Sequence, residues 1–221
     1  MAVDRRLLLP ALAMLPAVAL ADSWPQPPLP DGTKTADVAQ HMVFNGLDMH
    51  AQVFRSNQTP AQVVAFYRNT WNGRVVVNPL GDAQVIGHRD GDYYVTIQVS
   101  PAGGGSKGNI GVVDVADAPH DFQPGKGLPR PMGSTVFNDI AYPDDRVPAR
   151  TVAMTNALSP QQNAAWFRER LAGEGWKNVD DNRCAQDACV LGYERGDSHL
   201  ALVATRTRDG HSQVVLNVQQ P

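Results

Sequence analysis

The sequence of 221 residues has only two cysteines, no long apolar run after its first residues and no block of basic residues. Without about 18 consecutive apolar residues, no stretch of the mature chain is predicted to span a membrane as a helix. The 19 basic residues are scattered and the net charge is −3. Because phosphate binding needs clustered Lys and Arg, nucleic acid is not expected as a partner. The composition indicates an ordinary globular chain of one or two domains.

Recognisable catalytic and metal-binding motifs are also missing. The six histidines form neither a His-x-x-x-His nor a His-Glu-x-x-His pattern, and no Gly-x-Ser-x-Gly motif occurs. Residues 103–108 are rich in glycine but lack the spacing of a phosphate-binding loop, so a hairpin loop is expected there. The densest cluster, His120 with three neighbouring aspartates, lies in an irregular segment that contains a proline. The sequence therefore predicts no catalytic residue, no cofactor and no metal site.

Residues 1–21 are predicted to be a signal peptide. Arg5 and Arg6 precede an apolar run that ends in the small-residue pattern Ala19-Leu20-Ala21. The arginine pair leaves both the general secretory route and the twin-arginine route open. We therefore expect a periplasmic or secreted protein that begins at Asp22 after cleavage, is soluble and keeps no stable membrane span.

The two cysteines, Cys184 and Cys189, are expected to form a disulfide, because an exported protein meets an oxidising compartment. The loop between them is short, so the stabilisation should lie at the low end of about 2–4 kcal/mol. A redox pair usually has two intervening residues, whereas this pair has four, and a zinc site would need further ligands nearby. A structural disulfide is the prediction.

Two parts of the chain resemble each other. Residues 59–68, TPAQVVAFYR, match residues 159–168, SPQQNAAWFR, at four of ten positions. Residues 85–92, VIGHRDGD, match residues 190–197, VLGYERGD, at four of eight positions. The first block begins in both copies with a hydroxyl N-cap, a proline and a glutamine that completes a capping box. We interpret the chain as a tandem duplication.

Each copy is predicted to contain one strand, one helix and an antiparallel meander. In the first copy the patterns predict a strand at 49–55, a helix at 60–71, a short lead-in at 74–78, and strands at 83–89, 93–100 and 110–115. In the second copy they predict a strand at 151–155, a helix at 160–172, and strands at 189–193, 200–205 and 213–218. The expected fold class is α+β, a tandem duplication of a small β-α-β-β-β unit with antiparallel sheets and one helix per repeat.

Two proline-rich segments set the expected domain boundaries. Residues 22–32 contain four prolines, and residues 117–134 contain four prolines and three glycines, which favours extended linkers. The expected division is a signal peptide at 1–21, a Pro-rich linker at 22–40, repeat 1 at 41–116, a Pro/Gly linker at 117–134 and repeat 2 at 135–221.

Arg68 and Arg168 are the one charged position kept in both predicted helices. They are candidates for a repeated anion or partner contact, and the alternative is a solvent-side arginine or a salt bridge to a strand. With no constellation of reactive residues, we expect an exported, non-catalytic module that mediates protein–protein interaction or assembly with a protein of the bacterial envelope. Two alternatives stay open: a periplasmic small-ligand or anion-binding protein that uses Arg68 and Arg168, and an enzyme of unrecognised type.

Overall fold

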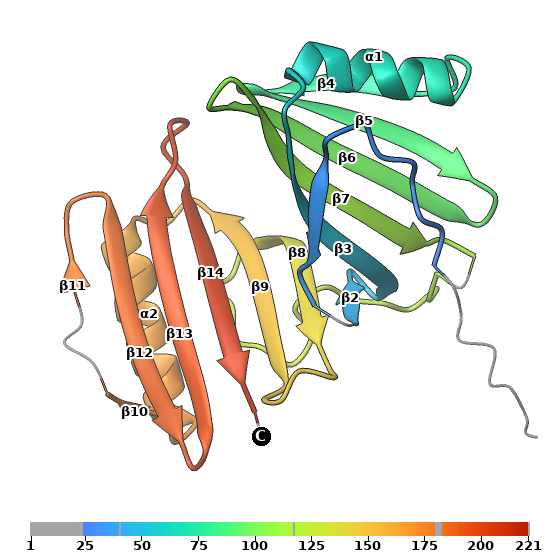
Figure 1. Cartoon of the computed structure of the whole chain (residues 1–221). Coiled ribbons are helices and arrows are strands. Elements are labelled where there is room, and N and C mark those ends of the chain that lie inside the picture. Colours follow the sequence, from blue (N-terminus) through green and yellow to red (C-terminus); the bar gives the residue numbers. More distant parts are fainter. Residues whose placement is uncertain (1–23, 40, 117, 180–182, 221) are drawn as a thin grey trace, which may run out of the picture.

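The computed structural model describes residues 24–39, 41–116, 118–179 and 183–220, and the predicted signal peptide at 1–21 lies outside them. Strands make up 49% of the described residues and helices 13%. Fourteen strands form a single antiparallel sheet, and two helices lie against it (Figure 1). The expected α+β class, with antiparallel sheets and one helix per repeat, is therefore wrong, because the protein is mostly β, with one 14-stranded sheet and only two helices in its described part.

Along the chain, two helices separate three groups of strands. The strands of the first half are β1 (Lys34–Asp37), β2 (Met42–Phe44), β3 (Leu47–Ser56), β4 (Val76–Leu80), β5 (Ala83–Asp90), β6 (Tyr93–Ala102) and β7 (Gly105–Asp114). Those of the second half are β8 (Thr135–Tyr142), β9 (Ala149–Asn156), β10 (Lys177–Asn178), β11 (Arg183–Cys184), β12 (Ala188–Arg195), β13 (Ser198–Arg206) and β14 (Ser212–Gln219). The helices are α1 (Pro60–Thr70), after β3, and α2 (Pro160–Gly173), after β9.

The strand order of the sheet reads alike from both ends. It is β10-β12-β13-β14-β9-β8-β2-β3-β7-β6-β5-β4, with β1 paired to β3 and β11 paired to β12. The two halves meet where β2 pairs with β8, so that Val43 lies opposite Ala141 and Phe44 opposite Ile140. The sequence patterns predicted neither of these strands. Their pairing is the physical reason that the two meanders form one sheet instead of two.

Both helices begin where the capping signals predicted. Thr59 and Ser159 each accept a hydrogen bond from the backbone N–H three residues later, and each capping box is completed by a glutamine side chain. The buried faces of the helices rest on separate hydrophobic cores. Tyr67 of α1 packs over β5 and β6, and Phe167 of α2 packs over β12 and β13. Each helix therefore packs on the strands of its own half.

The register places the two cores on the same side of the sheet. Val43 and Ala141 pair across the seam, so their side chains lie on the same face of the sheet. The buried side chains of Phe54 and Val152, on the neighbouring strands, lie on that face too, because every second residue of a strand shares a face. We call this side the helix face and the opposite side the open face. No helix of the described part of the chain covers the open face.

Part of the segment interpreted as an N-terminal linker is docked on the first half. β1 pairs with β3 over four residues, and the Thr33 hydroxyl donates a hydrogen bond to Ser56 Oγ at 3.0 Å. Trp24 packs edge-on against Tyr93, with ring centroids 5.5 Å apart. The strand β1 thus extends the sheet beside β2.

Candidate functional site

Arg68 and Arg168 lie on different helices over different halves of the sheet. Both side chains are exposed, and neither forms an ion pair with a described carboxylate. Their helices pack on separate strands, α1 on β5 and β6, and α2 on β12 and β13. The structure therefore does not bring the two guanidinium groups together in one site.

The His120 cluster lies in the connection between the halves. His120 and Asp121 are exposed in an irregular segment, Asp114 caps the backbone N–H of Ala116, and Asp117 lies outside the described residues. Among the residues that the structure describes, no group of three His, Cys, Asp or Glu side chains is placed to hold a metal ion.

Three titratable groups do converge at the seam between the halves. His41 Nδ1 lies 3.0 Å from Asp144 Oδ2, and His41 Nε2 lies 3.2 Å from Asp48 Oδ1. The hydrogen bond with Asp48, assisted by Asp144, raises the pKa of His41 above its ordinary value. Both ring nitrogens are occupied by carboxylates, so the imidazole has no free nitrogen with which to accept a proton from a substrate. The cluster joins β3 to the loop after β8.

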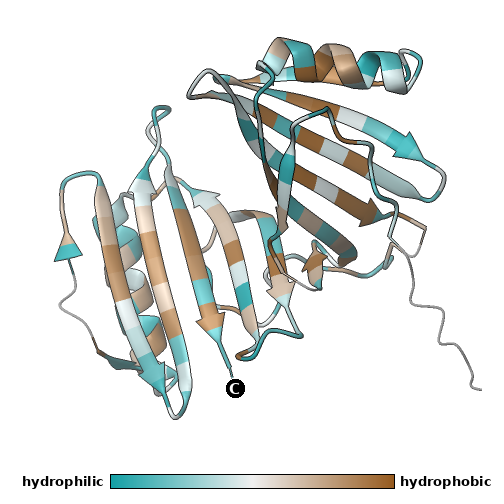
Figure 2. Cartoon of the chain, viewed as in Figure 1, coloured by the Kyte–Doolittle hydropathy of each residue, from teal (hydrophilic) through white to brown (hydrophobic). Residues whose placement is uncertain are grey.

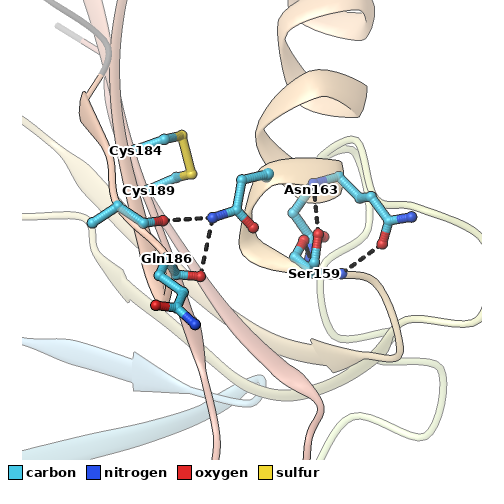
Figure 3. The surroundings of a disulfide bond; sticks show 8 residues. Ser159, Asn163, Cys184, Gln186 and Cys189 are labelled. Carbon is cyan, nitrogen blue, oxygen red and sulfur yellow. Dashed lines mark hydrogen bonds between the residues drawn. A yellow bond between two sulfur atoms is a disulfide. The ribbon is translucent and has the colours of Figure 1, made fainter.

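The predicted disulfide between Cys184 and Cys189 is confirmed, with an S–S distance of 2.03 Å. It closes the turn between β11 and β12 (Figure 3). The side chain of Gln161, in the first turn of α2, donates hydrogen bonds to the backbone carbonyls of Ala185 and Gln186. The disulfide loop is thereby fastened to the start of the helix, and the bond has a structural role.

The second half carries an apolar patch on the open face. A solvated sheet face is usually polar, because antiparallel strands alternate between buried apolar and exposed polar residues. Here a row of apolar side chains instead crosses four neighbouring strands: Val190 of β12, Val203 of β13, Val215 of β14 and Ala153 of β9. Val190 is 50% exposed and Val203 is 36% exposed, whereas Val215 is half-buried and Ala153, at 5%, is buried. Figure 2 shows hydrophobic segments side by side on β12, β13 and β14.

The residues around this row complete the patch. Gly192 and Ala201 pair two residues further along β12 and β13 than Val190 and Val203, and they extend the apolar centre of the patch with small residues. Polar or charged residues surround it on the same face: Glu194, His199, Thr205, Gln213, Asn217 and Thr155. In the first half the matching row reads Val85, Gln98, Asn109 and Val53, so its two central strands are polar. Only the second half has an uninterrupted apolar row.

Comparisons with protein-family models, with curated proteins and with solved structures found no match to this chain. The open-face patch is therefore judged on its own chemistry. Within the described ranges, no helix has the length and hydrophobicity required to cross a bilayer.

A sequence signal for the patch existed. Residues 200–204, LALVA, are apolar at every position, which is typical of a strand with two apolar faces. The strand predicted at 200–205 is present as β13, and its continuous apolar run marks a second apolar face.

Proposed function

We propose that the protein is an exported, non-catalytic module that binds another protein of the bacterial envelope through the apolar patch of its second half. The observation that carries the proposal is the apolar row on the open face, in which Val190 and Val203 are exposed, Val215 is half-buried and Ala153 forms the buried end. The centre of the patch offers methyl groups and no charge. The fitting partner is therefore a protein with an apolar surface of its own.

The arrangement of the patch supports a protein partner. Single exposed apolar residues are normal on a protein surface, whereas contiguous ones that are rimmed by polar groups are typical of interfaces. Transfer of apolar surface from water into an interface is favourable by roughly 25 cal/mol per Å². Glu194, His199 and Gln213 stand at the rim, where they can set the orientation of a partner.

The compartment belongs to the same proposal. The disulfide between Cys184 and Cys189 is compatible with export, because such bonds persist in oxidising compartments. A periplasmic or secreted location follows from the predicted leader at 1–21, and the predicted partner is accordingly a protein of the envelope.

The test replaces the apolar row by the residues of the matching row. The patch variant, Val203→Gln/Val215→Asn, introduces the residue types that Gln98 and Asn109 supply in the first half. The control variant, Val76→Gln, changes a valine that is 58% exposed on the edge strand β4. Parent and variants are immobilised, incubated with envelope extract and washed, and the retained proteins are quantified by mass spectrometry.

We expect the parent and Val76→Gln to retain the same partner protein. The amount retained by the patch variant should be at least about tenfold lower, equivalent to about 1.4 kcal/mol of binding free energy. Equal retention by all three forms would contradict the proposal. Light scattering adds a further criterion. If the parent is a dimer and the patch variant a monomer, the patch binds a second copy and the proposal of a different partner is wrong.

A further inference from the structure

Three cationic side chains stand in a row on the open face of the first half. Lys34 of β1 lies opposite Arg55 of β3, and Arg55 lies opposite Lys107 of β7. All three residues are exposed. Neighbouring strands are about 4.8 Å apart, so the row extends about 10 Å across the sheet. We call these three residues the cationic row.

No described carboxylate neutralises the cationic row. Lys34, Arg55 and Lys107 line one cavity, which contains no acidic residue, and none of the three forms an ion pair with a carboxylate in the described part of the chain. Asp37, the acidic residue of β1, belongs to the helix face. There the side chain of Gln52 donates a hydrogen bond to its carboxylate at 2.8 Å.

The fold does not require the cations. Like charges directly opposite each other on neighbouring strands destabilise a sheet. In the second half the matching positions are Thr135, Thr155 and Gln213, which pair in the same way without any charge. The same strand order is thus built with neutral residues, and the concentration of charge in the first half calls for a binding role.

The cavity beside the cationic row is a groove of about 640 Å³ over β1, β3, β7 and β6. Ser100 of β6 extends the row by a hydroxyl group, opposite Lys107. Two residues along the strands, about 7 Å away, lies a second row without charge. It consists of Ala36, Val53, Asn109 and Gln98. The groove therefore presents positive charge at one end, and methyl and amide groups at the other.

We propose that this groove binds a small organic anion. The phosphate or carboxylate group of the ligand is held by Lys34, Arg55 and Lys107, because guanidinium and ammonium groups form charge-assisted hydrogen bonds with both. The uncharged body of the ligand lies on Val53 and the side-chain amides of the second row. The ligand is expected to be small because a polymeric anion needs a longer run of cations. The cationic row spans only three strands, and the whole chain has a net charge of −3. The groove lies on the first half and is independent of the apolar patch.

The experiment titrates the ¹⁵N-labelled protein with three probes at low salt and follows the backbone amide signals. Glycerol 3-phosphate presents a phosphate and N-acetylaspartate presents two carboxylates on an otherwise uncharged body, and inorganic phosphate lacks the body. The groove variant, Arg55→Thr/Lys107→Gln, introduces the residue types of the second half. The control variant, Arg68→Thr/Arg168→Gln, removes the same charge from the two helices.

We expect at least one organic probe to shift the amide signals of β1, β3 and β7, and to bind more tightly than inorganic phosphate. The affinity should fall at least about tenfold in the groove variant, stay unchanged in the control variant, and weaken with added salt because the row is exposed. The organic probe that binds more tightly identifies phosphate or carboxylate as the ligand group.

Three results would overturn the proposal: an unchanged affinity in the groove variant, a loss of affinity confined to the helix variant, or no shift at the groove with any probe. The amide spectrum of each variant reports its folding in the same experiment. The single change Lys34→Thr, on the short strand β1, provides a second test that leaves β3 and β7 intact.

Discussion

Arg150 of β9 holds the buried carboxylate of Asp139 of β8 with two hydrogen bonds, from Nε to Oδ1 at 2.8 Å and from Nη2 to Oδ2 at 2.7 Å. The backbone N–H of Gly125 donates to the same carboxylate at 2.7 Å, and Arg150 Nη1 donates to the carbonyl of Lys126 at 3.0 Å. The pair thereby fastens the connection between the halves to the helix face, beside the β2–β8 seam.

The first prediction concerns this ion pair. Arg150→Met leaves the Asp139 carboxylate, which is 3% exposed, without its counter-charge. Loss of one partner of a buried pair costs about 3–5 kcal/mol, and the low end applies because the Arg150 side chain is 32% exposed. Urea unfolding measures the loss. Asp139→Asn/Arg150→Met should recover part of it, and a double variant no more stable than Arg150→Met would contradict the explanation.

The pH dependence of the same pair has a defined sign. Burial by itself raises the pKa of Asp139, but the hydrogen bonds from Arg150 and Gly125 outweigh it, so the pKa lies below its ordinary value of 3.8. A carboxyl group whose pKa is lower in the folded state stabilises the fold above its unfolded pKa. That contribution is lost as the pH falls through the folded pKa. The acid branch of the stability curve should therefore flatten in Asp139→Asn.

A second prediction concerns His41, whose pKa is raised by Asp48 and Asp144. Its charge stabilises the folded state fully below the unfolded pKa, and this contribution disappears as the pH rises through the higher folded pKa. The side chain is 36% exposed, so solvent screening limits the effect to about 1 kcal/mol or less.

The measurement for His41 is urea unfolding from about pH 5 to about pH 9, which covers the range in which histidine titrates. Relative to His41→Gln, the parent should be more stable at the acidic end and should lose this advantage above the ordinary histidine range. His120→Gln, in the exposed connection, serves as control. An advantage that grows with pH would contradict the predicted sign.

A third prediction concerns the aromatic residues at equivalent places in the two helices. Tyr67 and Phe167 are 1% and 0% exposed in separate cores. Replacement of either by alanine should lower the free energy of unfolding by about 3–5 kcal/mol, because a cavity replaces a buried ring. Phe66→Ala and Trp166→Ala, one position earlier in each helix, should cost less, because these rings are only partly buried at the edges of the same cores. A loss below about 1 kcal/mol for Tyr67→Ala or Phe167→Ala would break the proposed equivalence of the halves.

The fourth prediction is that reduction of the disulfide destabilises the protein without unfolding the sheet. Cys184 and Cys189 are five residues apart, so the closed loop is short and the loss should lie near 2 kcal/mol, at the low end of the usual range of about 2–4 kcal/mol. Unfolding in the presence and absence of a reductant measures it. The Cys184→Ala/Cys189→Ala variant should show no further response to the reductant, and any response would point to an effect elsewhere.

The elements predicted correctly from the sequence are those that local chemistry specifies. Thr59-Pro60 and Ser159-Pro160 started the helices, since capping depends on residues within one turn. β2 was not predicted, although Asn45 and Gly46 both adopt positive φ in the turn to β3, and an Asn-Gly pair is a strong hairpin signal. β8, which pairs with β2 and joins the halves in one sheet, was not predicted either.

The candidate sites divide in the same way. The helix starts, the hairpin turns of the meanders and the cysteine pair could be predicted from the sequence, because each depends on residues close together in the chain. Lys34, Arg55 and Lys107 are scattered in the sequence, and only the pairing of β1, β3 and β7 puts them in one row. The valine row likewise depends on the register of four strands. Tertiary structure decided both surfaces, because strand pairing sets which distant residues share a face.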